Sequence, residues 1–272
     1  MTTAWLLRQR SIPDLGIDFA AVSPGRVAGL TADELARTAL PLGRETVALG
    51  ELFEVVARDG DGPELRIEGD CRRLHGIGRG MDGGRIVVDG PVGDYLGAEM
   101  TAGEIRVDGD AGLLAACALA GGRIEIGGDV GDFAASSLPG ATDGMRGGVL
   151  VVRGNAGARF GDRMRRGTAV VHGAVGDFLA SRMVAGTIAL GAAVGEHPAF
   201  GMRRGTLVFA GDKPRVPDTF SPTAHDIGVF WALLARSLAP FGGAFDGLGG
   251  RPPGRVVGDL AVDGKGEWLL PA

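Results

Sequence analysis

Residues that could act as nucleophiles, proton carriers or metal ligands are few and scattered in this sequence. The histidines and cysteines are His75, His172, His197, His225, Cys71 and Cys117. Cys71 and His75 are four residues apart, but no further ligand accompanies them, and a zinc site needs three or four protein ligands. No serine lies in a nucleophile-elbow frame. No pair of carboxylates stands in apolar surroundings, as general acid–base catalysis requires. The residues predict neither a catalytic nor a metal site.

A glycine-rich stretch at 78–83, Gly-Arg-Gly-Met-Asp-Gly, matches the dinucleotide-binding fingerprint on paper. That fingerprint indicates a nucleotide site only between a strand and a helix. Here its methionine belongs to a repeating column, so we expect a turn between repeat units.

Arginines form a more distinctive set. When Met145, Met164, Met183 and Met202 are aligned, seven arginines fall within two positions of a methionine: Arg146, Arg163, Arg165, Arg166, Arg182, Arg203 and Arg204. Stacked units would gather these cations at one corner, where their mutual repulsion requires neutralising anionic groups. The planar guanidinium pairs with carboxylates through two hydrogen bonds. We expect these carboxylates to come from this chain, for example from Asp162, or from a partner protein.

These side chains must be positioned by a 19-residue repeat. The opening glycines of the units are Gly84, Gly103, Gly122, Gly148, Gly167, Gly186 and Gly205, with steps of 19, 19, 26, 19, 19 and 19 residues. Two and four residues after each glycine the side chains are apolar, which is the period of a half-buried strand. The first of each pair should form one interior column: Ile86, Ile105, Ile124, Leu150, Ala169, Ile188 and Leu207.

This period excludes helix-pair and hexapeptide repeats. It predicts an all-β fold, a single-stranded right-handed parallel β-helix of seven to eight coils with small N- and C-terminal caps. The long step indicates a seven-residue insertion, Ser137 to Asp143, that should loop out without disturbing the stack.

The flanking segments lack the repeat. We expect an N-terminal cap over 1–63, the repeat domain over 64–211, and a C-terminal cap and partner-docking tail over 212–272. In the first segment, Thr31 should cap a short helix and Val47 to Val56 should form a strand. In the last, Ser221 should cap a helix that either covers the last coil or docks on a partner. The apolar tail residues Phe241, Phe245, Trp268 and Leu269 are candidate partner contacts.

Composition narrows the class of protein. The net charge of −5 does not favour nucleic acid. No signal-peptide pattern and no apolar run near 18 residues appear, so no membrane association is expected. Two cysteines without a disulfide framework are typical of the cytoplasm.

The repeat, Gly-x-Ile-x-Val-x-Gly-x-x-Gly followed by Met-x-x-Gly, resembles the C-terminal β-helix domain of the glutamate synthase large subunit. It resembles still more the C subunit of formylmethanofuran dehydrogenase. The similarity is clearest in 84–103 and 167–186, and the stretch 258–267 resembles the ending of that protein. The resemblance covers about residues 50 to 270.

This resemblance implies a non-catalytic structural subunit in one-carbon metabolism. In methylotrophic bacteria the related complex is a formyltransferase/hydrolase, which passes a formyl group from tetrahydromethanopterin to a methanofuran analogue and hydrolyses it to formate. The arginine-rich, lysine-poor composition favours this bacterial branch. The expected partners are a formyltransferase subunit and amidohydrolase-like subunits, one of which holds zinc. The carriers serve the complex, and no cofactor is expected in this chain.

Other interpretations stay open. One is the C subunit of a molybdenum or tungsten formylmethanofuran dehydrogenase in a methanogen. Another is a detached glutamate synthase-like β-helix domain or a polysaccharide-active β-helix enzyme. Because methanofuran-type carriers have glutamate-rich tails, the resemblance also implies a second role for the arginines, in guiding such a tail.

Overall fold

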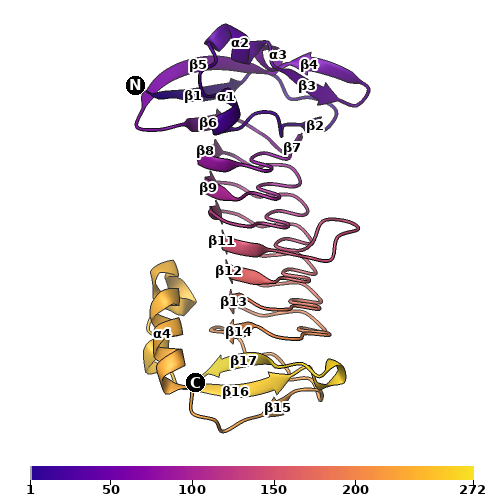
Figure 1. Cartoon of the computed structure of the whole chain (residues 1–272), viewed down its shortest axis with the longest axis vertical. Coiled ribbons are helices and arrows are strands. Elements are labelled where there is room, and N and C mark those ends of the chain that lie inside the picture. Colours follow the sequence, from indigo (N-terminus) through magenta and orange to yellow (C-terminus); the bar gives the residue numbers. More distant parts are fainter. Residues whose placement is uncertain (1) are drawn as a thin grey trace.

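A computed structural model describes residues 2–272, and its architecture is mostly β. The strands that follow the repeat are β6 (Glu64–Glu68), β8 (Asp82–Asp89), β9 (Ala102–Val107), β10 (Arg123–Ile126), β11 (Arg146–Val152), β12 (Arg166–Val171), β13 (Thr187–Leu190) and β14 (Thr206–Phe209). Each pairs in parallel with the next, within a sheet of 13 strands. Figure 1 shows one strand per repeat unit along the length of the molecule.

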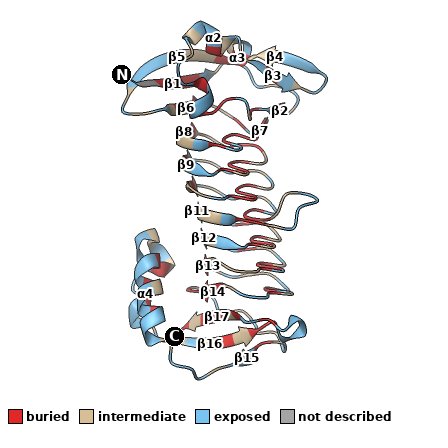
Figure 2. Cartoon of the chain, viewed as in Figure 1, coloured by how far each residue is buried: buried red, intermediate tan, exposed pale blue. Residues whose placement is uncertain are grey.

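The predicted interior column is confirmed. All seven of its side chains are fully buried, and each is the register partner of the next, as Ile86 is of Ile105. A second line of contacts lies on the other side of each unit, where isolated parallel bridges join Val92 to Ala111 and then to Val130. Figure 2 shows the buried positions recurring from unit to unit. The buried side chains of successive units form one continuous core. Burying one leucine or isoleucine of this column contributes about 1.5–3 kcal/mol.

The insertion also behaves as predicted. Ile124 of β10 pairs with Leu150 of β11 although 26 residues separate them, so the register passes across the insertion unchanged. The extra residues form a loop that projects from the stack (Figure 1). The loop leaves the core because the inward positions on either side of it are already filled.

The N-terminal segment adds two strands to the same sheet. β1 (Thr2–Gln9) pairs in parallel with β6 and antiparallel with β5 (Phe53–Gly60). The predicted capping box at Thr31 is present at the start of α2 (Ala32–Ala36). The remaining elements are α1 (Pro24–Val27) and a small second sheet of β2 (Ile17–Asp18), β3 (Ala39–Leu42), β4 (Glu45–Ala48) and β7 (Leu74–His75).

The strand predicted over Val47 to Val56 is wrong in part. It is divided by the helical turn α3 (Leu49–Leu52), which joins β4 to β5. Leu49 and Leu52 are both buried. Both leucines reach the core because a helical turn places residues three apart on one side, and an unbroken strand would have placed them on opposite faces.

The C-terminal segment folds back on the stack. It contains β15 (Ser221–Pro222), α4 (Gly228–Leu238), the short 3-10 helices η1 (Ala239–Phe241), η2 (Gly243–Phe245), η3 (Leu248–Gly250) and η4 (Leu260–Val262), and the strands β16 (Pro253–Gly258) and β17 (Gly266–Pro271). β17 pairs in parallel with β14 and antiparallel with β16, so this hairpin closes the end of the sheet.

Two expectations for this segment were wrong. Ser221 lies in a strand, and the helix begins only at Gly228, whose amide donates to Asp226. The helix does not cover the last unit either. It packs on the outer side of the sheet through Trp231 and Ala235, because the β16–β17 hairpin already occupies the end (Figure 1).

The tail residues chosen as partner contacts are mostly internal. Phe245, Trp268 and Leu269 are fully buried, and Phe241 is half-buried against the second core. Trp268 stacks on Phe209 and is the register partner of Leu207. These aromatic side chains serve the chain's own core, so they are unavailable to a partner. Within residues 2–272, no helix has the length and apolar character needed to cross a membrane.

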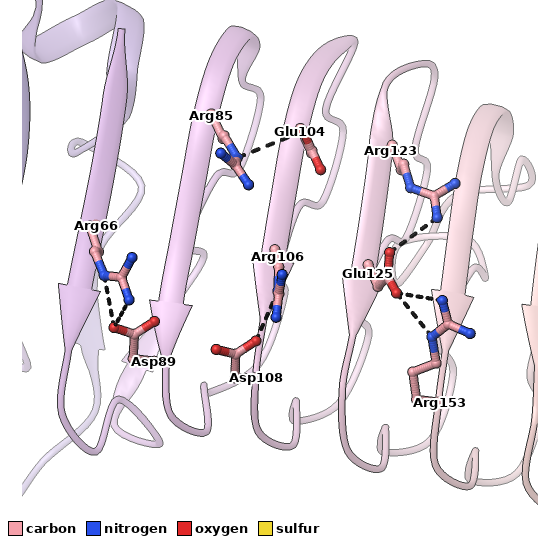
Figure 3. Close-up of polar contacts among 9 residues, drawn as sticks. All are labelled: Arg66, Arg85, Asp89, Glu104, Arg106, Asp108, Arg123, Glu125 and Arg153. Carbon is pink, nitrogen blue, oxygen red and sulfur yellow. Dashed lines mark hydrogen bonds and ion pairs between the residues drawn. The ribbon is translucent and has the colours of Figure 1, made fainter. Parts of the chain in front are cut away.

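The outer face of the large sheet divides into two halves. In the first half, outward side chains form ion pairs within and between neighbouring repeat units, among the nine residues drawn in Figure 3: Arg66, Arg85, Asp89, Glu104, Arg106, Asp108, Arg123, Glu125 and Arg153. In the second half, the outward residues Val170, Ala189 and Val208 are apolar and lie beneath α4 and the segment that follows it.

Candidate functional site

The arginines predicted from the repeat divide into two groups. Five of them line a single surface groove of about 560 Å³, together with Val184 and Ala185: Arg146, Arg165, Arg166, Arg203 and Arg204. We call this the arginine groove. The remaining two, Arg163 and Arg182, lie beside it, on a neighbouring hollow of about 480 Å³ that shares Arg165 and Arg203 with the groove.

The local sequence explains why the groove arginines point outward. The methionines that precede them, such as Met164, are fully buried and hold the chain at the turn into each strand. The amides of Arg165 and Arg166 both donate to the carbonyl of Met145, 2.8 and 3.2 Å away. Arg146 and Arg166 are register partners at the start of β11 and β12. Two arginine side chains therefore start from opposed backbone positions, next to a shift in the strand register, and like charges so placed are unfavourable between paired strands.

Most of the groove's positive charge is uncompensated. Arg165 forms an ion pair with Asp143 of the insertion loop at 2.5 Å. Arg166, Arg203 and Arg204 form no ion pair with any of residues 2–272, and all three are exposed. No carboxylate lines the groove. A guanidinium stays protonated in proteins and cannot exchange protons, so the groove suits anion binding and not acid–base chemistry.

The charges of Arg163 and Arg182 are compensated by Asp162, the acid that the sequence analysis proposed. The carboxylate of Asp162 is buried and accepts hydrogen bonds from Arg182 at 2.8–3.0 Å, and Arg163 lies 3.8 Å away. Arg163 also donates to the carbonyl of Ala141 in the insertion loop. These two arginines anchor the loop and the corner, and they are poor candidates for a free ligand site.

One cation near the groove escaped the sequence analysis. Thr206 of β14 pairs with Glu267 of β17, and the amide of Lys265 donates to the carbonyl of Arg203 at 2.7 Å. Lys265 thus follows Arg203 and Arg204 at the end of the stack. The segment 266–271 has the sequence pattern of a strand. Its parallel pairing with β14, which brings Lys265 to this end of the stack, depends on a long-range return of the chain and could not be predicted locally.

The candidate nucleophiles and ligands have structural roles. Burial raises the pKa of both Cys71 and Cys117 to about 12, so each thiol stays protonated and unreactive. The Nδ1 atom of His75 accepts a hydrogen bond from the amide of Asp94. Among residues 2–272, no group of three histidine, cysteine or acidic side chains is placed to hold a metal ion.

The other sequence motifs are also part of the scaffold. The glycine-rich stretch at 78–83 runs through a turn into β8, and no helix follows it. Three aspartates at equivalent positions of their repeat units also link each unit to the next. The carboxylates of Asp94, Asp132 and Asp177 each accept a hydrogen bond from a backbone amide of the following unit. These aspartates satisfy backbone donors that the turns leave free.

Comparisons with known proteins were made on sequence and on structure. No protein-family model matches the chain. The C subunit of the tungsten-containing formylmethanofuran dehydrogenase 2 of Methanothermobacter wolfeii is 35% identical over 96 residues, which is 34% of this chain and 36% of that protein. The C subunit of the molybdenum-containing formylmethanofuran dehydrogenase 1 of Methanosarcina barkeri is 32% identical over 99 residues, 35% and 33% of the two proteins. The matched region thus spans about a third of these curated relatives.

A solved structure matches over nearly the whole chain. It is a chain in the crystal structure of the formyltransferase/hydrolase complex (FhcABCD) from Methylorubrum extorquens in complex with methylofuran. The TM-score is 0.90 and the sequence identity 40%, covering 98% of this chain and 99% of that one.

Proposed function

This chain belongs to the family that comprises the C subunit of formylmethanofuran dehydrogenase and its counterpart in the formyltransferase/hydrolase complex, and from that membership we propose that it is a non-catalytic structural subunit of such a complex. The observation that carries this proposal is the match at 40% identity over 98% of the chain. The buried, protonated cysteines agree with it, because they leave no activated nucleophile.

The proposed reaction of the complex is formyl transfer from tetrahydromethanopterin to a methanofuran analogue, followed by hydrolysis to formate. Its catalytic partners would be a formyltransferase subunit and a zinc-holding amidohydrolase-like subunit. The second candidate, the C subunit of a formylmethanofuran dehydrogenase, is supported by matches over about a third of the chain only.

The stack itself is best interpreted as a right-handed, single-stranded parallel β-helix. One parallel strand per repeat unit and parallel pairing of each strand with the next from β6 to β14 support this, and parallel crossovers are right-handed in the great majority of cases. We keep 1–63 and 212–272 as caps about a repeat domain of 64–211, although the sheet itself continues through β1 and β17. A crystal structure with left-handed connections would contradict this interpretation.

For the arginine groove we propose contact with carboxylates of a carrier tail or of a partner subunit. Its uncompensated cations and the absence of lining acids support this role. Guidance by charge should weaken with salt, since screening acts over about 8–10 Å at physiological ionic strength.

The test is to co-express the chain with the transferase and hydrolase subunits. We expect a complex containing this chain, and no formate release or stoichiometric zinc in the purified chain alone. Formate release by the isolated chain would refute the structural role.

A second measurement concerns the groove. Arg165→Ala, Arg166→Ala and Arg204→Ala together should slow turnover with the full-length carrier at low salt. Arg106→Ala, an exposed arginine on the outer sheet face, is the matched control. A triple variant that assembles and turns over like the wild type would exclude a carrier track.

A further inference from the structure

Helix α4 has apolar side chains on both of its sides. Trp231, Ala235 and Leu238 pack inward on the sheet. On the opposite side, Val229 and Leu233 keep 79% and 64% of their surface exposed. They are four residues apart, so they form one ridge on the helix surface, and Phe230, 43% exposed, lies beside them. A helix that is apolar all round is normally buried on all sides.

No other part of residues 2–272 covers this ridge. The helix lies along the outer side of the stack, with its outward side facing away from β11 to β14 (Figure 1). The only charged residue within the helix is Arg236, which is also exposed and has no ion pair within residues 2–272. The ridge is therefore an apolar strip with a single cation near one end.

A second copy of this chain fits the ridge poorly. A helix of 11 residues is about 16 Å long and 10–12 Å across. Two such helices laid together bury far less than the roughly 800 Å² per partner of a stable interface.

We propose that the α4 ridge, formed by Val229, Phe230, Leu233 and Arg236, docks into an apolar groove on another subunit of the complex. This rests on the proposed function, which supplies a hetero-oligomer. A groove encloses a helix on several sides and buries more area than a second helix does, as in helix-in-groove recognition with anchors at i and i+4. The groove should carry a carboxylate facing Arg236, because a desolvated guanidinium needs a partner.

The experiment uses the full chain, co-expressed with the transferase and hydrolase subunits, as the wild type and as the double variant Val229→Glu, Leu233→Glu. Glutamate is a good helix former, so the isolated variant should unfold at the wild-type temperature. Leu113→Glu is the matched control, since Leu113 is an exposed leucine, 46% accessible, at a corner of the stack. If the glutamates lower the unfolding temperature, Val229→Ser, Leu233→Ser is the second variant to assay.

We expect the double variant to lose affinity for the complex by roughly tenfold or more, since a few central anchors dominate an interface, and the control to assemble like the wild type. Assembly of the folded double variant with wild-type affinity would overturn the proposal. So would light scattering that shows a dimer of the isolated chain, abolished by the double variant while assembly with the other subunits persists. A wild-type chain that joins no complex would instead refute the proposed function, and the docking proposal with it.

Discussion

The same outward column of strand residues has opposite character in the two halves of the stack. It is mostly charged near the N-terminal end, where it holds Arg66, Val87, Arg106 and Glu125, and apolar near the C-terminal end, where it holds Val151, Val170, Ala189 and Val208. The arginines form ion pairs in solvent, at 2.6 Å with Asp89 and 2.9 Å with Asp108. Val170 and Val208 are fully buried beneath α4 and η2.

The inward column is apolar in both halves, so it cannot explain this difference. The outward column alone distinguishes a face that remains in water from one that a later segment covers. A repeat can therefore keep its register while each unit contributes a different surface.

Arg153 joins the two halves. It donates to Glu125 at 2.7 Å on the charged side and to the carbonyl of Phe241 at 2.8 Å on the covered side. Burial by itself would raise the pKa of Glu125, but hydrogen bonds from Arg153 and Arg123 outweigh it and lower that pKa. Glu125 therefore stays ionised and holds Arg153 in place.

The largest effect is expected when a charged residue is introduced at the same outward position in each half of the stack. Val208→Asp should destabilise the chain by about 3 kcal/mol or more, because it buries a carboxylate without a partner. Arg106→Asp, at the equivalent outward position of β9, should cost less than about 1 kcal/mol, because the new carboxylate beside Asp108 stays in solvent. Urea unfolding of both variants checks this, and equal losses would mean that the two halves are not different environments.

A smaller effect is expected at the boundary. Arg153→Ala should lower the free energy of unfolding by about 1–2 kcal/mol. Most of this should come from the lost bond to the Phe241 carbonyl, since the ion pair with Glu125 is partly solvated. Hydrogen exchange should show α4 and η1 opening more often, with β8 and β9 unaffected. Uniform loss of protection would indicate that Arg153 does not act locally.

A pH dependence should be confined to the covered half. Burial lowers the pKa of His172, with a further contribution from Arg153, and its ring packs on Phe245 at 5.2 Å. The unfolded chain thus binds this proton more tightly. The stability contributed by neutral His172 is complete above its ordinary pKa of 6.5 and is lost as the pH falls from there toward the folded value.

Hydrogen-exchange rates of the backbone amides in η2, measured between about pH 7.5 and 5.5 and corrected for the intrinsic effect of pH on exchange, check this prediction. We expect them to rise on acidification in the wild type and to rise less in His172→Gln. A rise in β8 of the same size would assign the effect to other groups.

The smallest effect concerns the arginine groove. Arg146→Ala should raise the free energy of unfolding by about 0.2–0.5 kcal/mol, because like charges directly opposite each other between strands are destabilising. Salt should reduce the gain. Arg66→Ala, which removes a paired arginine, should show no gain. Thermal unfolding at low and high salt distinguishes the two, and a loss of stability in Arg146→Ala would mean that its repulsion with Arg166 is already compensated.

Patterns in the sequence alone predict the register of the stack, the interior column from Ile86 to Leu207, the looped insertion and the family. These follow from patterns local to each unit, because strand alternation and turn glycines act within a few residues. The sequence also indicates an arginine-rich corner, since the spacing from the buried methionines repeats.

Contacts between distant segments of the folded chain establish which arginines lack an ion pair and which surface is covered. Arg182 forms an ion pair with Asp162 while Arg166 does not, although both lie within two positions of a repeat methionine. Helix α4 lies on the side of the sheet, and Trp268 is internal because β17 returns to pair with β14. Those contacts join residues far apart in the chain, and an apolar side chain favours burial without specifying which apolar surface will bury it.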